Sequence, residues 1–246
     1  MKEETRWKVT AGIALITLTL FLMTVHFLIF QDSHHLFIYF LGDLAFLPVE
    51  VLLVTLIIDQ MLSSREKQLR MEKLNMVIGI FFSRAGTPLL DRFARADQNE
   101  GPLTGIPTGT PWTAEKFRMV HADIAGWNGT IDPARIDFPA LREFLVGNED
   151  FLLRIMENPT VFEHESFTDL ILAVAHLAEE LKARSDFTLL PPSDLAHLTG
   201  DTERVYSRLV PEWLKYMEYL QRSYPYLFSL ALRKNPFDKT ASVVVR

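Results

Sequence analysis

The sequence predicts an all-α protein: a two-helix transmembrane hairpin followed by a cytoplasmic helical bundle. Two apolar runs predict the hairpin. Val9–Phe30 contains no charged residue, and Leu36–Ile58 contains only Asp43 and Glu50. A helix rises about 1.5 Å per residue, so each run is long enough to cross a hydrocarbon core of about 30 Å. After residue 112, apolar residues recur mainly at helical spacing, which predicts the bundle.

The polar residues 31–35 between the runs are too few for anything but a tight turn. Because Lys and Arg flank both runs but are absent from this turn, the positive-inside rule places both termini in the cytoplasm. We therefore expect residues 1–60 to anchor the chain in the cell (inner) membrane as a multi-pass protein, with spans at 9–30 and 36–58. The first run is too long for a secretory signal and lacks a small-residue cleavage site. The basic residues after the hairpin are expected at the membrane surface, where each adds about 1 kcal/mol on anionic lipid: Arg65, Lys67, Arg70 and Lys73.

Asp43 and Glu50 are seven residues apart, so they lie near one face of the second helix. An ionised side chain near mid-bilayer costs about 2.5–3.5 kcal/mol, and such residues face a partner, another subunit or water. Counting back through the hairpin places Asp43 within one turn of His26. Two interpretations remain open. In the first, these residues fix helix packing: Asp43 pairs with His26, and Glu50 is protonated, bonded to a Thr, or a donor to the carbonyl freed by a kink at Pro48. In the second, they line a cation or proton path in an oligomer. Two spans cannot enclose a pore alone.

The helix of the second span is expected to continue into a juxtamembrane segment, residues 61–97. Leu62, Leu69 and Met76 recur there every seven residues. Gly86-Thr87-Pro88 should interrupt the pattern before a short helix that reaches Ala96. Residues 98–112 are rich in Gly, Pro and Thr and predict a linker. No Gly-Lys-Ser/Thr follows its glycines, so a phosphate-binding loop is not indicated.

Residues 113–235 are expected to form the cytoplasmic helical domain, and residues 236–246 a tail. Capping residues and prolines set the predicted helix ends. The predicted helices run from a cap at Thr113 to about Ala125, from Pro139 to near Gly147, from a cap at Asn148 to Asn158, over 163–184, from Asp201 past Leu220, and over 227–233. A short turn at 194–198 is expected to separate the fourth helix from the fifth.

No pattern in this domain predicts catalysis or a metal site. His176 stands near Glu179 and Glu180, but neither paired Glu-x-x-His motifs nor His-Glu-x-x-His occurs, so solvated faces are expected. The chain has no cysteine, which excludes thiolate chemistry. We therefore predict no metal, no cofactor and no catalytic residue. Among the C-terminal aromatic residues, Trp213 and Tyr216 are expected in the core, and Tyr219 and Tyr224 at a contact surface.

Three stretches carry a resemblance to known sequences: residues 222–237 (RSYPYLFSLALRKNPF), 59–62 (DQML) and 73–79 (KLNMVIG). With these stretches the chain resembles a group of uncharacterised prokaryotic membrane proteins with two spans and a cytoplasmic helical domain. The resemblance implies this architecture over most of the chain. It implies no activity and supplies no site residues.

These features together predict a membrane-anchored, non-enzymatic protein that acts through protein–protein contact. We expect a homo-oligomeric scaffold or regulator that contacts the lipid bilayer and a cytoplasmic protein partner. Basic and acidic residues are nearly balanced beyond the hairpin, which argues against nucleic acid as the main partner. The alternative is an oligomeric cation channel or proton-conducting protein that uses Asp43 and Glu50.

Overall fold

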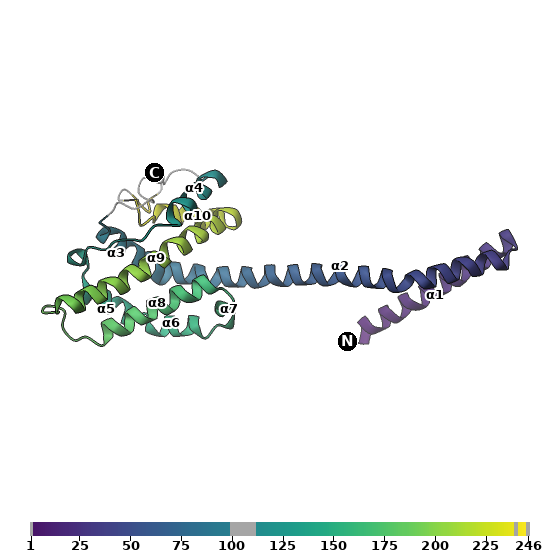
Figure 1. Ribbon diagram of the computed structural model, residues 1–246, viewed down its shortest axis with the longest axis horizontal. Helices are drawn as coiled ribbons and strands as arrows, with labels where there is room; N and C mark the ends of the chain where they lie inside the picture. The colour runs from purple at the N-terminus through teal and green to yellow at the C-terminus, as the bar shows by residue number, and fades with distance from the viewer. Residues whose placement is uncertain (1, 99–111, 239–240, 245–246) are drawn as a thin grey trace. The chain divides into compact units, whose positions relative to one another are not determined.

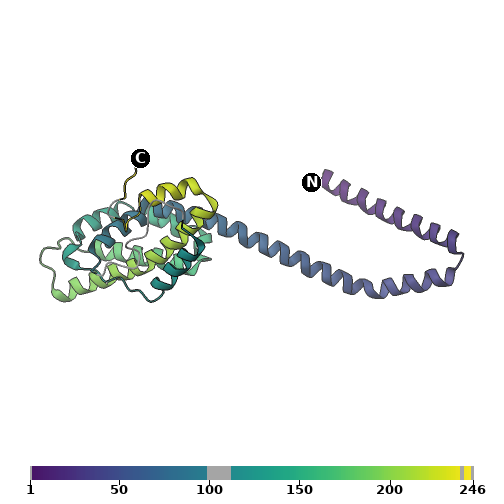
Figure 2. The same ribbon diagram turned by 90° about the horizontal axis from the view of Figure 1, so that it is seen from above.

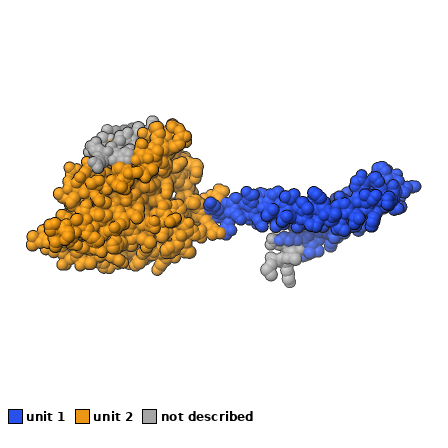
Figure 3. Space-filling model, viewed as in Figure 1, with its two compact units in different colours: residues 1–67 blue, residues 68–246 orange. Residues whose placement is uncertain are grey.

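The computed structural model describes residues 2–98, 112–238 and 241–244, and these residues are helical apart from turns and one isolated bridge, Asp97–Ile131. The chain divides into two compact units, residues 1–67 and 68–246 (Figure 3). The all-α class is therefore confirmed for the described residues. The predicted linker 98–112 lies almost entirely outside them.

The first unit holds α1 (Lys2–Phe30) and the beginning of α2 (Ser33–Phe81). Only Gln31 and Asp32 separate the helices, and the chain reverses direction there (Figures 1 and 2). Gln31 has a φ of 48°, and the Asp32 side chain accepts hydrogen bonds from the His34 and His35 amides at 3.0 Å. Both helices are long and apolar enough to cross a membrane, and their apolar windows are not buried within the chain. The tight turn is confirmed.

A π-helical turn, Phe82–Gly86, joins α2 to α3 (Thr87–Ala96) without a break. The wider turn allows Phe81 and Phe82, which are neighbours in sequence, to be fully buried together. A Cβ atom at Gly86 would lie 2.5 Å from Cδ1 of Phe82, so this position has no room for a larger residue. The predicted interruption at residues 86–88 is therefore a change of helix type that keeps the chain in the core.

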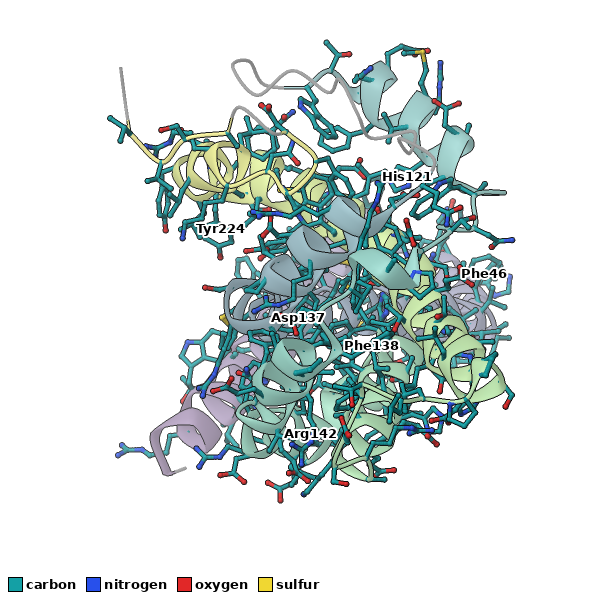
Figure 4. All side chains as sticks on the ribbon, turned by 90° about the vertical axis from the view of Figure 1, so that its left-hand side faces the viewer. Phe46, His121, Asp137, Phe138, Arg142 and Tyr224 are labelled. Carbon is teal, nitrogen blue, oxygen red and sulfur yellow. The ribbon has the colours of Figure 1, made fainter. Side chains whose placement is uncertain are left out.

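The second unit is a helical bundle centred on α8 (Glu165–Lys182) and α9 (Pro192–Ser223), against which most of the other helices pack (Figure 1). Several predicted helix starts are confirmed: Thr113 caps α4 (Ala114–Ile124), Pro139 lies in the first turn of α5 (Phe138–Val146), and Asn148 precedes α6 (Glu149–Met156). Asp137, Phe138 and Arg142 mark the course of α5 in Figure 4. The remaining described helices are α7 (Pro159–Phe162), α10 (Pro225–Arg233) and a single 3₁₀ turn, Pro133–Arg135.

The prediction that a helix starts at Asp201, after a separate turn at 194–198, is wrong. α9 begins at Pro192 and runs through both segments without interruption. Pro192 occupies the first turn, where its missing N–H costs no hydrogen bond. Asp201 is therefore an interior helix residue, and its side chain is only 2 % exposed.

Candidate functional site

A groove of about 1660 Å³ runs along the second unit between α2–α3 and α9–α10. Tyr216 stacks on Phe82, with ring centroids 5.1 Å apart, and lines the groove. The groove combines an apolar, aromatic wall with basic side chains near α3 and at the end of α10. Its wall includes Met76, Ile80, Tyr216, Tyr219, Tyr224, Leu227 and Leu230, and its basic residues are Arg84, Arg92, Arg95, Arg233 and Lys234.

The aromatic residues of this region divide between core and groove. Trp213 is 2 % exposed and packs on Trp112 and Phe237, so its predicted place in the core is confirmed. Tyr219 and Tyr224 meet edge to face at 5.7 Å, and Tyr224 lies at the periphery of the domain (Figure 4). Burial and the hydrogen bond with Tyr224 raise the pKa of Tyr219 to about 12, so the Tyr219 phenol stays neutral at pH 7 and can form a hydrogen bond with a partner.

The arginines of the groove are mostly held by side chains of the same domain. Arg84 donates to Oδ1 of Asn148 at 3.2 Å and lies over the Phe151 ring. Arg92 lies over the Phe144 ring at 4.3 Å. Because these two arginines already contact side chains of their own domain, we expect a partner to bind the groove mainly through its apolar wall.

A second polar cluster joins α8 to α9 in the interior. The Glu212 carboxylate is buried and accepts hydrogen bonds from Ser166 Oγ at 2.7 Å and Lys215 Nζ at 2.6 Å. Lys215 also donates to Ser166 Oγ at 3.1 Å. Nucleophilic catalysis by Ser166 would need a general base that accepts its proton and a third group that orients that base. Here the serine, the lysine and the carboxylate link α8 to α9 directly, an arrangement that fits helix packing better.

A third cluster brings together four side chains, among them His176 and Glu180, which were expected on solvated faces, and Asp201, which was expected at a helix start. His176 and Glu180 come from α8, and His197 and Asp201 from α9. Nε2 of each histidine lies close to Oδ2 of Asp201, at 3.5 Å for His176 and 3.4 Å for His197. Both histidines are about half exposed, whereas Asp201 is buried. The matching spacing of the two pairs, four residues apart on each helix, is the signal that sequence reasoning overlooked.

Arg184 links this cluster to the start of α9. Its guanidinium contacts Oε2 of Glu180 at 2.8 Å and both carboxylate oxygens of Asp194 at 2.6 and 2.9 Å. These hydrogen bonds lower the pKa of the Glu180 and Asp194 carboxyls. Both carboxylates thus remain ionised at neutral pH and fix the turn between the two helices.

We expect Arg184→Gln to lower the melting temperature at pH 7 and to have little effect near pH 3. A carboxyl with a depressed folded-state pKa stabilises the fold above its unfolded pKa and loses this effect as pH falls through the folded value. Thermal unfolding followed by circular dichroism at both pH values measures the difference. Arg95→Gln, which removes a more exposed pair with Asp91, is the control and should change little. An Arg184→Gln effect that is equal at both pH values would contradict the ion-pair explanation.

The predicted intramembrane residues lie on the two helices of the first unit. The His26 ring lies 4.7 Å from the Phe30 ring, and its Nε2 has no hydrogen-bond partner. Within the described chain, no hydrogen bond or ion pair joins His26 to Asp43, and Asp43 and Glu50 are exposed. Their pairing or conducting role stays a prediction.

The four predicted membrane-surface cations all lie on α2 and are exposed. Arg70 differs from the others because its guanidinium contacts Glu163 at 3.4 Å in the second unit. That pair is half exposed and adds little stability. Lipid contact by Arg65, Lys67, Arg70 and Lys73 stays a prediction.

Comparisons with known sequences match both parts of the chain. The family model described as "MJ1433, N-terminal helical domain" matches residues 2–62, and the model described as "Uncharacterized protein MJ1433, C-terminal helical domain" matches residues 70–233. MJ1433 of Methanocaldococcus jannaschii is 43 % identical over 243 residues, which cover 98 % of each chain. No solved structure matches the chain significantly.

Proposed function

The chain belongs to the MJ1433 family, and from this premise we propose that it is a membrane-anchored protein whose C-terminal helical domain acts through contact with other protein chains. The observation that carries the proposal is the pair of apolar helices whose side chains are not buried within the chain. Soluble proteins rarely expose contiguous apolar surface on this scale. A lipid bilayer would cover this exposed apolar surface.

The flanking charges support one orientation of the hairpin. Lys2, Arg6 and Lys8 lie in the first turns of α1, and further Lys and Arg residues follow residue 64 of α2, whereas residues 31–35 include neither type. The positive-inside rule then places both termini and the C-terminal domain in the cytoplasm. The cell (inner) membrane is the proposed location.

A second copy of the chain is the proposed first partner. Within the second unit, Leu74, Ile78 and Phe81 bury one face of α2, while Met76 and Ile80 leave an apolar stripe exposed beside the groove. Chains anchored in the same membrane meet at a raised effective concentration, so even a modest apolar contact favours self-association. A homo-oligomeric scaffold or regulator is the resulting function.

The subunit count of the full-length protein in native-like membrane discs tests this proposal. We expect native mass spectrometry to show a dimer or larger assembly. Met76→Glu together with Leu230→Glu should shift the population to monomers, because the charges oppose burial of the groove wall. Leu189→Glu, on a fully exposed loop away from the groove, is the matched control and should leave the assembly intact. A monomer for the unaltered chain at all concentrations would refute the self-contact.

Conduction by an oligomer is the second candidate, favoured by one observation. Asp43 and Glu50 lie two turns apart on α2, and neither forms a hydrogen bond or ion pair with another described residue. Carboxylates within a bilayer need a partner or water, which a central path between subunits would supply. Glu50→Gln should then change ion or proton flux into liposomes without altering the subunit count, whereas unchanged flux would remove Glu50 from any path.

A further inference from the structure

We propose that His176, Glu180, His197 and Asp201 form a four-ligand site for a divalent transition-metal ion of the Zn²⁺ class, which joins α8 to α9. The site is independent of the membrane hairpin and of the groove. Each helix supplies one histidine and one carboxylate four residues apart, so both side chains of a pair lie on the same helix face.

The antiparallel register of α8 and α9 places these pairs opposite each other. His176 faces Asp201, and Glu180 faces His197, with closest N–O distances of 3.5 and 3.6 Å. His197 also lies 3.4 Å from Asp201, and His176 lies 4.0 Å from Oε1 of Glu180. A tetrahedral ion with bonds of about 2.0–2.1 Å keeps its ligand atoms about 3.3–3.4 Å apart. Both distances to Oδ2 of Asp201 are close to this spacing. The Glu180 carboxylate must shift to bring Oε1 closer to both histidines, because His176 is 4.0 Å from Oε1 and the contact of His197 is with Oε2.

Asp201 supplies the observation that points to a missing ligand. Its side chain is 2 % exposed, and Oδ2 is buried and accepts no hydrogen bond among the described residues. Two imidazole nitrogens stand at 3.4 and 3.5 Å from this oxygen, but neither donates a hydrogen bond to it. A buried carboxylate oxygen without a hydrogen bond is costly. A metal ion between the carboxylate and both imidazoles would compensate for this cost.

Arginines hold the outer oxygens of both carboxylates. Arg204 contacts Oδ1 of Asp201, and Arg184 contacts Oε2 of Glu180 at 2.8 Å. Oδ2 of Asp201 and Oε1 of Glu180 are thereby left for the ion. Metal sites commonly use such outer partners to orient their ligands. Asp194 pairs with Arg184 and offsets part of the added positive charge.

The donor set indicates the class of ion. Two imidazole nitrogens and two carboxylate oxygens suit Zn²⁺ and its neighbours in the first transition row, whereas Mg²⁺ and Ca²⁺ prefer sites made of oxygen alone. Because the histidines are about half exposed, the ion can enter from solvent and leave again. Four protein ligands complete a tetrahedral shell, which is typical of a site that stabilises the fold.

Zn²⁺ binding to the full chain, in discs of zwitterionic lipid and after chelator treatment, tests the site. His34 and His35 are also adjacent and exposed, so His34→Gln/His35→Gln serves as the parent for all variants. We expect one Zn²⁺ per chain in the parent by equilibrium dialysis and metal analysis. His176→Gln/His197→Gln in this background should lose it. His121→Gln is the matched control, because His121 also faces a carboxylate, Glu218, at 3.5 Å, and it should retain the ion.

Two further readouts do not depend on how the variants fold. At a free Zn²⁺ concentration one hundred times the Kd, the folded state of the parent should gain about 100-fold in its equilibrium with the unfolded state. Co²⁺ in place of Zn²⁺ should give the intense visible absorption of a tetrahedral site. No Zn²⁺ in the parent, equal Zn²⁺ in parent and double-histidine variant, or the weak absorption of octahedral Co²⁺ would each overturn the proposal. In the first two cases the four residues are only an ion-pair cluster.

Discussion

Trp213→Ala should cost the C-terminal domain about 3–5 kcal/mol of its free energy of unfolding. Trp213 is 2 % exposed and lies where three segments meet: α9, residue 112 and the chain after α10. Truncation would leave a large cavity among rings that cannot collapse onto it. A typical domain has only about 5–15 kcal/mol in total, so the loss approaches unfolding.

Urea unfolding of the full chain in discs, followed by far-ultraviolet circular dichroism, measures this effect. Tyr226→Ala is the control, because Tyr226 is an aromatic residue of the same domain that is 71 % exposed. Its truncation should change stability by less than about 0.5 kcal/mol. Equal losses in the two variants would contradict the placement of Trp213 at the centre of the core.

Leu20→Arg together with Phe21→Arg should release the chain from the membrane. Two arginines at the middle of the first span cost roughly 5–7 kcal/mol on the scale of membrane insertion. Resistance to extraction at alkaline pH measures the retained fraction. Met61→Arg together with Leu62→Arg is the matched control, since these residues lie just beyond the second span and should be tolerated there.

The two pairs of residues are a well-matched comparison because their side chains are exposed to nearly the same extent in the isolated chain. Leu20 and Phe21 are 61 % and 62 % exposed, and Met61 and Leu62 are 58 % and 60 % exposed. A protein that stays in water would therefore respond alike to both double substitutions. Only a bilayer around residues 9–30 makes the first pair costly and the second harmless, so an equal response would contradict membrane insertion.

Local signals in the sequence predicted much of the fold. The tight turn predicted within residues 31–35, the cap at Thr113 and the first-turn proline at 139 are each inferred from a few neighbouring residues. The structure confirms all three, with the turn itself confined to Gln31 and Asp32. The start of α9 was predicted incorrectly because Asp201, after the turn expected at 194–198, resembles a helix cap. Tertiary packing decides such positions: α8 covers this part of α9 and keeps Asp201 inside the helix.

The His–Glu and His–Asp pairs show why a site is harder to predict than a helix. Each pair could be read from sequence as two residues four apart on one helix. Their meeting depends on the register of α8 against α9, which brings His176 to Asp201 across twenty-four intervening residues. The residues next to each pair in the sequence do not determine that register. It follows from the way that the buried faces of the two helices fit together.

Cysteine labelling of the hairpin turn and the C-terminal region tests the membrane-anchored architecture most directly. The chain has no cysteine, so Ser33→Cys and Ser242→Cys each provide a single labelling position. With a membrane-impermeant maleimide on intact cells, we expect Ser33→Cys to react at once and Ser242→Cys to react only after the membrane is permeabilised. Equal labelling of both positions in intact cells would contradict an anchored hairpin with a cytoplasmic domain.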